Sequence, residues 1–294
     1  NQDSLRMLYL GCGHLILHYK NESIATDPFF STQPFTAGKI KTSSAAFDKY
    51  IDILREHSFD LNLVNSIWLA HTHYDHMMDI PILIEKRMLN PGVKIYGNEY
   101  GDDILTNFLK SNQYQTLEPG YKWIMLSPSI RVMPIISDHA PHLKIWPFTL
   151  HLMKGELQEG YFKTKLKSSE SITKRKKWKE GHVYSFLIDF MNGERIDYRF
   201  FIQSSASKYP VGAPPAEILK EHPVDVAVLC VASSNTVKPY PVQILKDLNP
   251  KKVIFIHWED FFLKPLDFES PKLVRFTNLK KIKRRLDKAA LILN

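Results

Sequence analysis

The feature that most restricts the fold is an apolar run that ends abruptly in a cluster of histidine and aspartate side chains. The stretch "SIWLA" at 66–70 predicts a buried strand, and "HTHYDH" at 71–76 follows it without a break. Burying so many polar groups is costly unless the strand ends at a crevice, where the sites of α/β proteins gather. His71 and His73 are two residues apart, so on extended backbone their side chains point the same way. The motif therefore predicts a functional site at the end of this strand.

Strand-like and helix-like segments follow a similar order in two parts of the chain. In the first part, strands are expected at 5–10, 15–19, 23–27, 66–70 and 93–97, and helices at 45–57, 78–89 and 102–109. In the second part, strands are expected at 130–137, 183–190, 198–203, 226–231 and 252–256, and helices at 215–222, at 242–248 and at the C-terminus. This order predicts two mixed sheets packed together, with helices on the outer faces. The predicted fold class is α/β (α+β), a four-layer αββα sandwich. No linker rich in Gly, Ser or Pro divides the chain, so we expect a single domain over 1–294.

A basic insert is expected at about 155–181. Residues 163–180, "KTKLKSSESITKRKKWKE", carry eight Lys and Arg against two Glu, and the chain as a whole has a net charge of +8. The stretch has no apolar period, which predicts a solvated or protruding loop whose charges contribute little to stability. Its charge favours an anionic substrate, small or lipid-like, or peripheral contact with an anionic membrane surface. Few aromatic residues are interleaved with the charges, which argues against nucleic acid.

Other features restrict the class of protein less. No apolar stretch reaches the length of a transmembrane helix, and no secretory leader is visible. The sequence starts with Asn1, so we leave open a cytoplasmic location or export after removal of an upstream signal. The oligomeric state cannot be read from the sequence. The basic run at 279–288 keeps apolar spacing and predicts an amphipathic C-terminal helix.

The histidine motif and several other segments resemble the metallo-β-lactamase superfamily of metal-dependent hydrolases. Neutral imidazoles and carboxylates are the ligands of Zn²⁺ and similar ions. "IATDPFF", "SDHAPH" and "VIFIHWEDFF" resemble further motifs of that superfamily. The segments "LGCGHLIL" and "HWEDFF" are most similar to those of one branch of the superfamily. That branch contains the ascorbate-6-phosphate lactonases and the phospholipase D that hydrolyses N-acyl-phosphatidylethanolamines.

The resemblance implies the roles of individual residues. It implies His71, His73 and His139 for a first metal ion, and Asp75, His76 and His257 for a second. His142, three residues after His139, is an alternative ligand. Asp27 resembles the buried carboxylate that orients the site rather than binding metal. The implied cofactor is one or two Zn²⁺ ions, and Mn²⁺ or iron would also suit such ligands.

One segment departs from the family pattern. Most family hydrolases carry an Asp that bridges the two metals after the strand expected here at 198–203. This sequence reads "FFIQSSASKYP", in which Ser204 takes the Asp position and Gln203 is the alternative in a slipped register. Neither residue supplies the lost negative charge between two cations. We therefore expect the second metal to bind weakly or not at all.

The expected function is metal-dependent hydrolysis of an ester, lactone or phosphodiester. An open position on such a metal turns bound water into hydroxide near neutral pH. Asp75 would orient that water or accept its proton, and His257, or His76 if metal-free, would protonate the leaving group. Two alternatives stay open at this point: a degenerate member that binds metal but acts as a binding or regulatory protein, and a nuclease.

Overall fold

The computed structural model describes residues 4–141, 144–145, 148–149, 154–262, 272–274 and 278–293. They form two compact units, and each unit contains one six-stranded mixed sheet. The first unit consists of the described parts of 1–117, 152–181 and 259–272. The second consists of the described parts of 118–151, 182–258 and 273–294. That the chain is a single domain stays a prediction.

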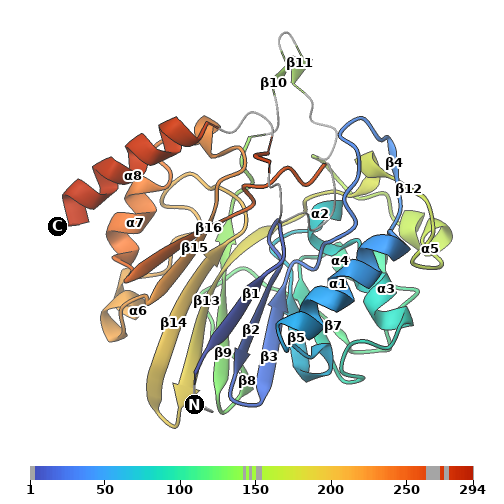
Figure 1. Cartoon of the computed structure of the whole chain (residues 1–294), viewed down its shortest axis with the longest axis horizontal. Helices are drawn as coiled ribbons and strands as arrows, with labels where there is room; N and C mark the ends of the chain where they lie inside the picture. The colour runs from blue at the N-terminus through green and yellow to red at the C-terminus, as the bar shows by residue number, and fades with distance from the viewer. Residues whose placement is uncertain are drawn as a thin grey trace. The chain divides into compact units, whose positions relative to one another are not determined.

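The first unit is built on a sheet in the order β1-β2-β3-β5-β6-β7. Its strands are β1 (Arg6–Tyr9), β2 (Leu15–Tyr19), β3 (Glu22–Thr26), β5 (Val64–Trp68), β6 (Lys94–Gly97) and β7 (Tyr114–Thr116). The first three form an antiparallel meander, and β5, β6 and β7 continue the sheet in parallel. Its helices include η1 (Leu61–Leu63), α1 (Ser44–Glu56), α2 (Tyr74–Met77), α3 (Ile80–Glu85) and α4 (Gly101–Leu105). Figure 1 shows α1, α3 and α4 on one side of this sheet.

Helix α1 anchors the segment that follows β3. The Ser43 hydroxyl caps the helix by accepting a hydrogen bond from a first-turn amide at 3.2 Å. Phe47, Tyr50 and Leu54 lie three and four residues apart and are buried, as an amphipathic helix requires. Tyr50 stacks on Phe30 with ring centroids 4.4 Å apart. This contact fixes the loop that begins at a predicted site residue, Asp27.

The second unit is built on a sheet in the order β16-β15-β14-β13-β9-β8. Its strands are β8 (Ile124–Ser127), β9 (Ile130–Ser137), β13 (Val183–Asn192), β14 (Arg195–Gln203), β15 (Val226–Cys230) and β16 (Lys252–Ile256). Strands β8, β9, β13 and β14 are antiparallel, whereas β15 and β16 run parallel to β14. Its helices are α6 (Ala216–Glu221), η3 (Ser234–Thr236), α7 (Val242–Leu248) and α8 (Leu279–Leu293). A short hairpin pairs β10 (Lys144–Ile145) with β11 (Phe148–Thr149).

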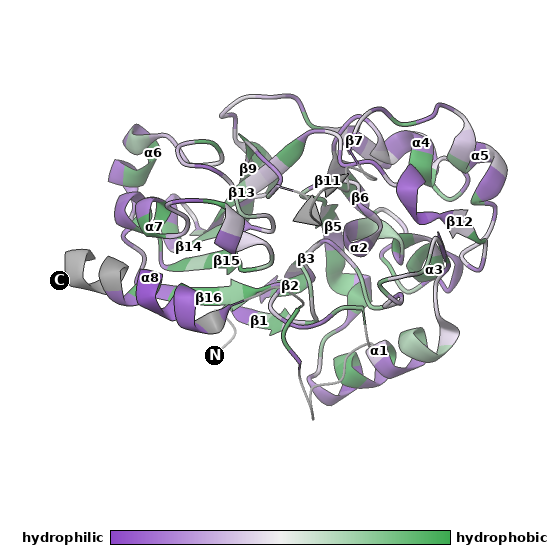
Figure 2. Cartoon of the chain, turned by 90° about the horizontal axis from the view of Figure 1, so that it is seen from above, coloured by the Kyte–Doolittle hydropathy of each residue, from purple (hydrophilic) through white to green (hydrophobic). Residues whose placement is uncertain are grey.

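Helix α8 is amphipathic, as its apolar spacing predicts. Ile282 is buried, Leu286 packs against the core of the second unit, and Lys283 is exposed. Figure 2 shows hydrophilic residues, in purple, along the coloured part of this helix. Arg285 donates hydrogen bonds to carbonyls of the 234–240 loop at 2.8 and 2.9 Å. Among the described helices, none is both long and apolar enough to cross a membrane.

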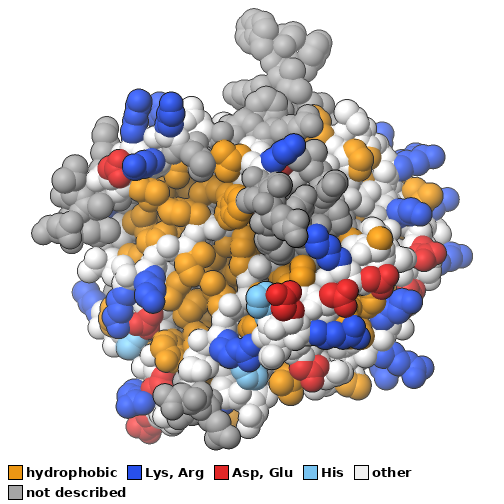
Figure 3. Space-filling model, viewed as in Figure 1, with side chains coloured by type: hydrophobic (Ala, Val, Ile, Leu, Met, Phe, Trp, Pro, Cys, Tyr) orange, Lys and Arg blue, Asp and Glu red, His pale blue; other side chains and the backbone are white. Residues whose placement is uncertain are grey.

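The basic insert is folded onto the first unit, so the predicted solvated loop is wrong. It contains α5 (Tyr161–Lys165), β12 (Thr173–Lys174), which pairs with β4 (Lys39–Ile40), and η2 (Arg175–Lys177). Phe162, Leu166 and Trp178 are at most 3% exposed and belong to the same core cluster as the buried side chains of α1. These apolar residues lie on one short helix and several turns, so no period revealed them. Figure 3 shows Lys and Arg side chains gathered over α5 and β12.

Arg175 in particular is not an exposed charge. Its Nη1 donates a hydrogen bond to the carbonyl of Phe35 at 2.6 Å, and Nη2 donates to that of Pro34 at 2.8 Å. The guanidinium carbon lies 4.9 Å from the ring centroid of Tyr74. We therefore expect Arg175, unlike the exposed charges of the basic run, to contribute to stability.

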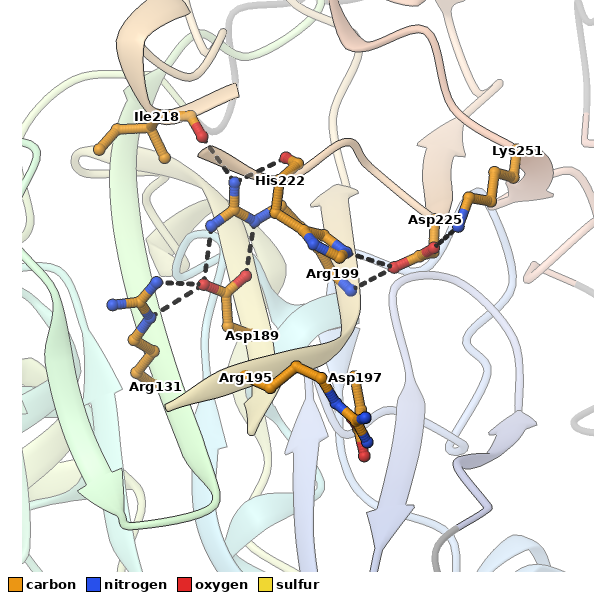
Figure 4. Close-up of polar contacts among 9 residues, drawn as sticks. All are labelled: Arg131, Asp189, Arg195, Asp197, Arg199, Ile218, His222, Asp225 and Lys251. Carbon is orange, nitrogen blue, oxygen red and sulfur yellow. Dashed lines mark hydrogen bonds and ion pairs between the residues drawn. The ribbon is translucent and has the colours of Figure 1, made fainter. Parts of the chain in front are cut away.

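A buried ion network holds the second sheet together across three strands (Figure 4). The strand register places Asp189 of β13 directly opposite Arg131 of β9 and Arg199 of β14. Asp189 and Arg199 are fully buried and form two bonds, at 2.6 and 2.8 Å. Arg199 Nη1 also donates to the carbonyls of Ile218 and His222, at 2.6 and 2.8 Å. One guanidinium therefore ties α6 and the residue after it to the sheet.

We predict that Arg199→Met lowers the free energy of unfolding by about 3–5 kcal/mol, because it leaves a buried carboxylate with only part of its charge compensation. Arg195→Met on the same strand is the matched control. Arg195 pairs with Asp197 at 2.7 Å, but its side chain is 73% exposed. Its loss should cost at most about 1 kcal/mol. Equal losses in urea denaturation would show that the buried network does not carry this stability.

Candidate metal centre

The loop after β5 buries the predicted metal ligands of the first unit. His71, His73, Asp75 and His76 are at most 7% exposed. Backbone contacts hold the loop in place: Leu69 N–H donates to Tyr96 O at 2.8 Å, and Ala70 N–H donates to Asp27 Oδ1 at 2.8 Å. A strand end therefore carries four polar side chains into the interior, as the sequence pattern requires.

His71 and His73 turn ring nitrogens toward each other. His71 Nε2 lies 3.0 Å from His73 Nδ1, and the two rings are nearly perpendicular at 77°. Two neutral imidazoles can satisfy this contact with one shared proton, whereas a metal ion would accept a lone pair from each nitrogen. The donor types and their convergence fit a Zn²⁺-like ion.

Asp75, His76 and Asp27 form the neighbouring cluster. His76 Nε2 lies 3.8 Å from Asp75 Oδ2, and His76 Nδ1 lies 3.1 Å from Asp27 Oδ2. Burial by itself lowers the pKa of His76, but Asp27 and Asp75 outweigh it and raise that pKa above its ordinary value. The Asp27 contact directs one ring nitrogen of His76 toward Asp75. That arrangement suits a carboxylate that orients a metal-binding histidine.

Asp27 depends on a close approach of the chain at Gly13. A Cβ atom at Gly13 would stand 2.4 Å from Asp27 Oδ2, closer than real contacts allow. Thr26 Oγ1 donates to the carbonyl of Gly13 at 2.6 Å and closes the turn. The second glycine in "GCGHL", Gly13, therefore leaves space for the Asp27 carboxylate.

Asp79 is a buried carboxylate to which the sequence analysis gave no role. Its Oδ2 accepts hydrogen bonds from the amides of Phe30 and Ser31, at 2.6 and 2.7 Å. Burial raises the pKa of Asp79 to about 6, against the lowering effect of these hydrogen bonds. Asp79 lies three residues after His76 in the sequence. Its two hydrogen bonds hold the loop that follows Asp27. Its position at the end of "HYDHMMD", just before an apolar helix, was the signal that could have revealed it.

The predicted ligands of the second unit follow two of its strands. His139 comes after β9, and its Nδ1 lies 2.7 Å from the carbonyl of Ala140. If Nδ1 donates this hydrogen bond, Nε2 keeps a lone pair for a metal. His257 comes directly after β16, is 5% exposed and has a positive φ of 58°. His142, the alternative to His139, lies outside the described residues.

The loop after β14 supports His139 but carries no carboxylate. The Ser205 hydroxyl accepts a hydrogen bond from Ala140 N–H at 3.0 Å. Gln203 and Ser204, the two candidates for the missing bridging Asp, are each 2% exposed. Ser204 Oγ has no hydrogen-bond partner among the described residues. Both candidates are neutral, and the loss of the bridging charge stays a prediction.

The two mixed sheets with their helices confirm the predicted fold class, and the chain has the metallo-β-lactamase fold. No family model matches the sequence, and no curated protein is similar enough to count as a match.

Solved structures of this fold match nearly the whole chain at low identity. One is the metallo-β-lactamase-fold protein YhfI from Bacillus subtilis, with 11% identity, a TM-score of 0.54, and coverage of 98% of this chain and 94% of that one. Another is Igni18, a metallo hydrolase from Ignicoccus hospitalis, with 14% identity, a TM-score of 0.52, and coverage of 98% and 92%. A third is isothiocyanate hydrolase from Delia radicum gut bacteria, with 12% identity, a TM-score of 0.52, and coverage of 97% and 92%. The resemblance to the lactonase and phospholipase branch stays a prediction.

We predict that Gly13→Ala lowers metal affinity and destabilises the chain by about 1–3 kcal/mol, because the new methyl group must displace the Asp27 carboxylate. Gly38→Ala is the control, since a Cβ there would meet nothing within 4 Å. Chelator competition and urea denaturation measure the two effects. Wild-type metal affinity in Gly13→Ala would contradict the role given to Asp27.

Proposed function

We propose that the chain is a metal-dependent hydrolase whose first metal ligands are His71 and His73. The observation that carries this proposal is the 3.0 Å convergence of His71 Nε2 and His73 Nδ1 in a buried loop at a strand end. His139 is the proposed third ligand. A second ion, if it binds, would take the remaining implied set, namely Asp75, His76 and His257. Zinc is the proposed ion because imidazole nitrogen and carboxylate oxygen both suit it.

An ion in this position would act as a Lewis acid and lower the pKa of a water molecule. The chain's own residues then have separate tasks. Asp75 is 7% exposed and offers a carboxylate that can orient the attacking water or accept its proton. Asp27 holds His76 by its Nδ1 and so fixes the ring beside Asp75. His257, or His76 when no second ion is bound, is the proposed donor of a proton to the leaving group.

The proposed substrate is an ester, lactone or phosphodiester that carries an anionic group. Arg175 supports this choice. Its guanidinium bonds to two neutral carbonyls, and no carboxylate among the described residues forms an ion pair with it. It lies over the ring of Tyr74, which is the residue between His73 and Asp75. A partly buried positive charge with neutral partners, in a chain of net charge +8, attracts anions to this side of the first unit.

A second candidate function is metal binding without hydrolysis, as in a regulatory protein. The neutral residues at the expected position of the bridging carboxylate, Gln203 and Ser204, favour it. Without that charge, a second cation would bind weakly and a single ion would have to support the chemistry alone.

We predict that His71→Ala or His73→Ala removes most of the bound zinc and abolishes hydrolysis, because each variant lacks one converging nitrogen. His57→Ala, which removes an exposed histidine, is the control. The readouts are metal content after purification without added metal, and turnover of simple ester, lactone and phosphodiester substrates. Full zinc content in either variant would refute the ligand assignment. Zinc binding by the wild-type chain with no turnover of any of the three substrate classes would favour the second candidate.

We predict that Ser204→Asp raises the occupancy of a second metal ion. The new carboxylate would restore the bridging negative charge between the two ions, which the proposed set of Asp75, His76 and His257 does not supply. Ser207→Asp places the same charge in the same loop and is the control for position. Titration calorimetry with zinc counts the ions per chain. An unchanged count in Ser204→Asp would mean that this residue does not occupy the bridging position.

A further inference from the structure

The folded insert returns to the histidine loop at Lys179 and Glu180. Thr72 lies between His71 and His73, and its hydroxyl donates a hydrogen bond to the carbonyl of Lys179 at 2.6 Å. The amide of Thr72 donates to the carbonyl of Glu180 at 3.2 Å. The end of the insert is therefore attached to the residue between the two proposed ligands.

Two further contacts fix the backbone of Glu180. Asn98 Nδ2 donates a hydrogen bond to the carbonyl of Glu180 at 2.6 Å. The next residue, Gly181, has a φ of 60°, and a Cβ there would stand 2.4 Å from Asn98 Nδ2. Only glycine allows this turn with the amide so close. These contacts fix the backbone from which the Glu180 side chain extends.

This backbone places the Glu180 carboxylate beside the remote nitrogen of His73. Glu180 Oε2 lies 4.0 Å from His73 Nε2, and the two side chains are 17% and 5% exposed. The other nitrogen of the same ring, Nδ1, faces His71 Nε2 at 3.0 Å. One nitrogen of His73 therefore faces the proposed metal position, and the opposite one faces a carboxylate.

We propose that Glu180 is a positioning residue for the metal ligand His73. Its carboxylate accepts the Nε2–H of His73, which keeps Nδ1 deprotonated and directed at the ion. The inference rests on the proposed function, because it assigns His73 to the metal. A carboxylate on the remote nitrogen of a ligating histidine fixes the tautomer and raises the basicity of the ligand. At 4.0 Å the two atoms are too far apart for a hydrogen bond, and we expect the distance to shorten to one when metal binds.

A parallel arrangement at His76 supports this assignment. His76 Nδ1 meets Asp27 at 3.1 Å, while its Nε2 lies toward Asp75. In both His73 and His76, one ring nitrogen thus faces another proposed ligand. The other ring nitrogen faces a carboxylate, Glu180 or Asp27. Asp27 comes from the sheet of the first unit, whereas Glu180 comes from the insert. The basic insert therefore contributes an acidic residue near its end, Glu180, to the proposed metal centre.

The test compares Glu180→Gln and Glu180→Ala with the control Glu170→Gln in the chain of residues 1–294. Glu170 belongs to the same insert, is exposed, and loses the same charge. Zinc affinity is measured by competition with a chromophoric chelator, and the stability of the metal-free protein is measured in urea. In zinc-loaded protein, ¹⁵N NMR of the histidine rings follows the Nε2–H proton of His73.

We expect Glu180→Gln to weaken zinc binding by about 10–100-fold, and Glu180→Ala at least as much, with metal-free stability unchanged. The His73 Nε2–H resonance should move upfield in both variants and stay in place in Glu170→Gln. Zinc affinity within twofold of wild type in both Glu180 variants would overturn the inference and leave the proposed function intact. A wild-type chain that binds no zinc would overturn both. Lower metal-free stability with an unchanged His73 resonance would show a purely structural Glu180, which also overturns the inference.

Discussion

The structure of the first unit depends on the burial of one polar loop, residues 71–76, at the end of β5. Burying imidazoles and carboxylates costs several kcal/mol unless each group finds partners. The surrounding chain supplies them. Asp27 contacts Ala70 and His76, Thr72 bonds to the end of the insert, and Asn98 holds the same turn. The loop, the turn around Gly13 and the insert are consequently parts of one polar arrangement.

That arrangement joins polar groups that lie far apart in the sequence. Asp79 bonds to amides 48 and 49 residues earlier, and Thr72 bonds to a carbonyl 107 residues later. These contacts limit how far the loop can move, because a shift of one partner leaves a buried polar group unsatisfied. Rigid support of this kind is what a metal site needs, since ligand geometry is set by the residues behind the ligands. In the sheet of the second unit, one side chain likewise satisfies several buried groups. Arg199 donates hydrogen bonds to the buried carboxylate of Asp189 and to two backbone carbonyls.

Much of the fold could be predicted because its signals are local. The apolar run before the histidines corresponds to β5, and the strands expected at 130–137 and 183–190 correspond to β9 and β13. The helix expected at 78–89 is shorter, because α3 ends at Glu85. The insert was mistaken for a solvated loop, since the spacing of Phe162, Leu166 and Trp178 follows no period. Asp79 and Glu180 were missed because their partners are distant in sequence, and no local pattern reports such contacts.

The central claim is that His71 and His73 hold a metal ion between their facing nitrogens. Diffraction from zinc-loaded crystals at the zinc absorption edge tests it most directly. The account predicts an anomalous peak about 2.0–2.1 Å from both His71 Nε2 and His73 Nδ1, the usual length of a zinc–imidazole bond. A peak bound only by carboxylates or surface histidines, with His71 Nε2 and His73 Nδ1 still 3.0 Å apart and no metal ion between them, would contradict the account.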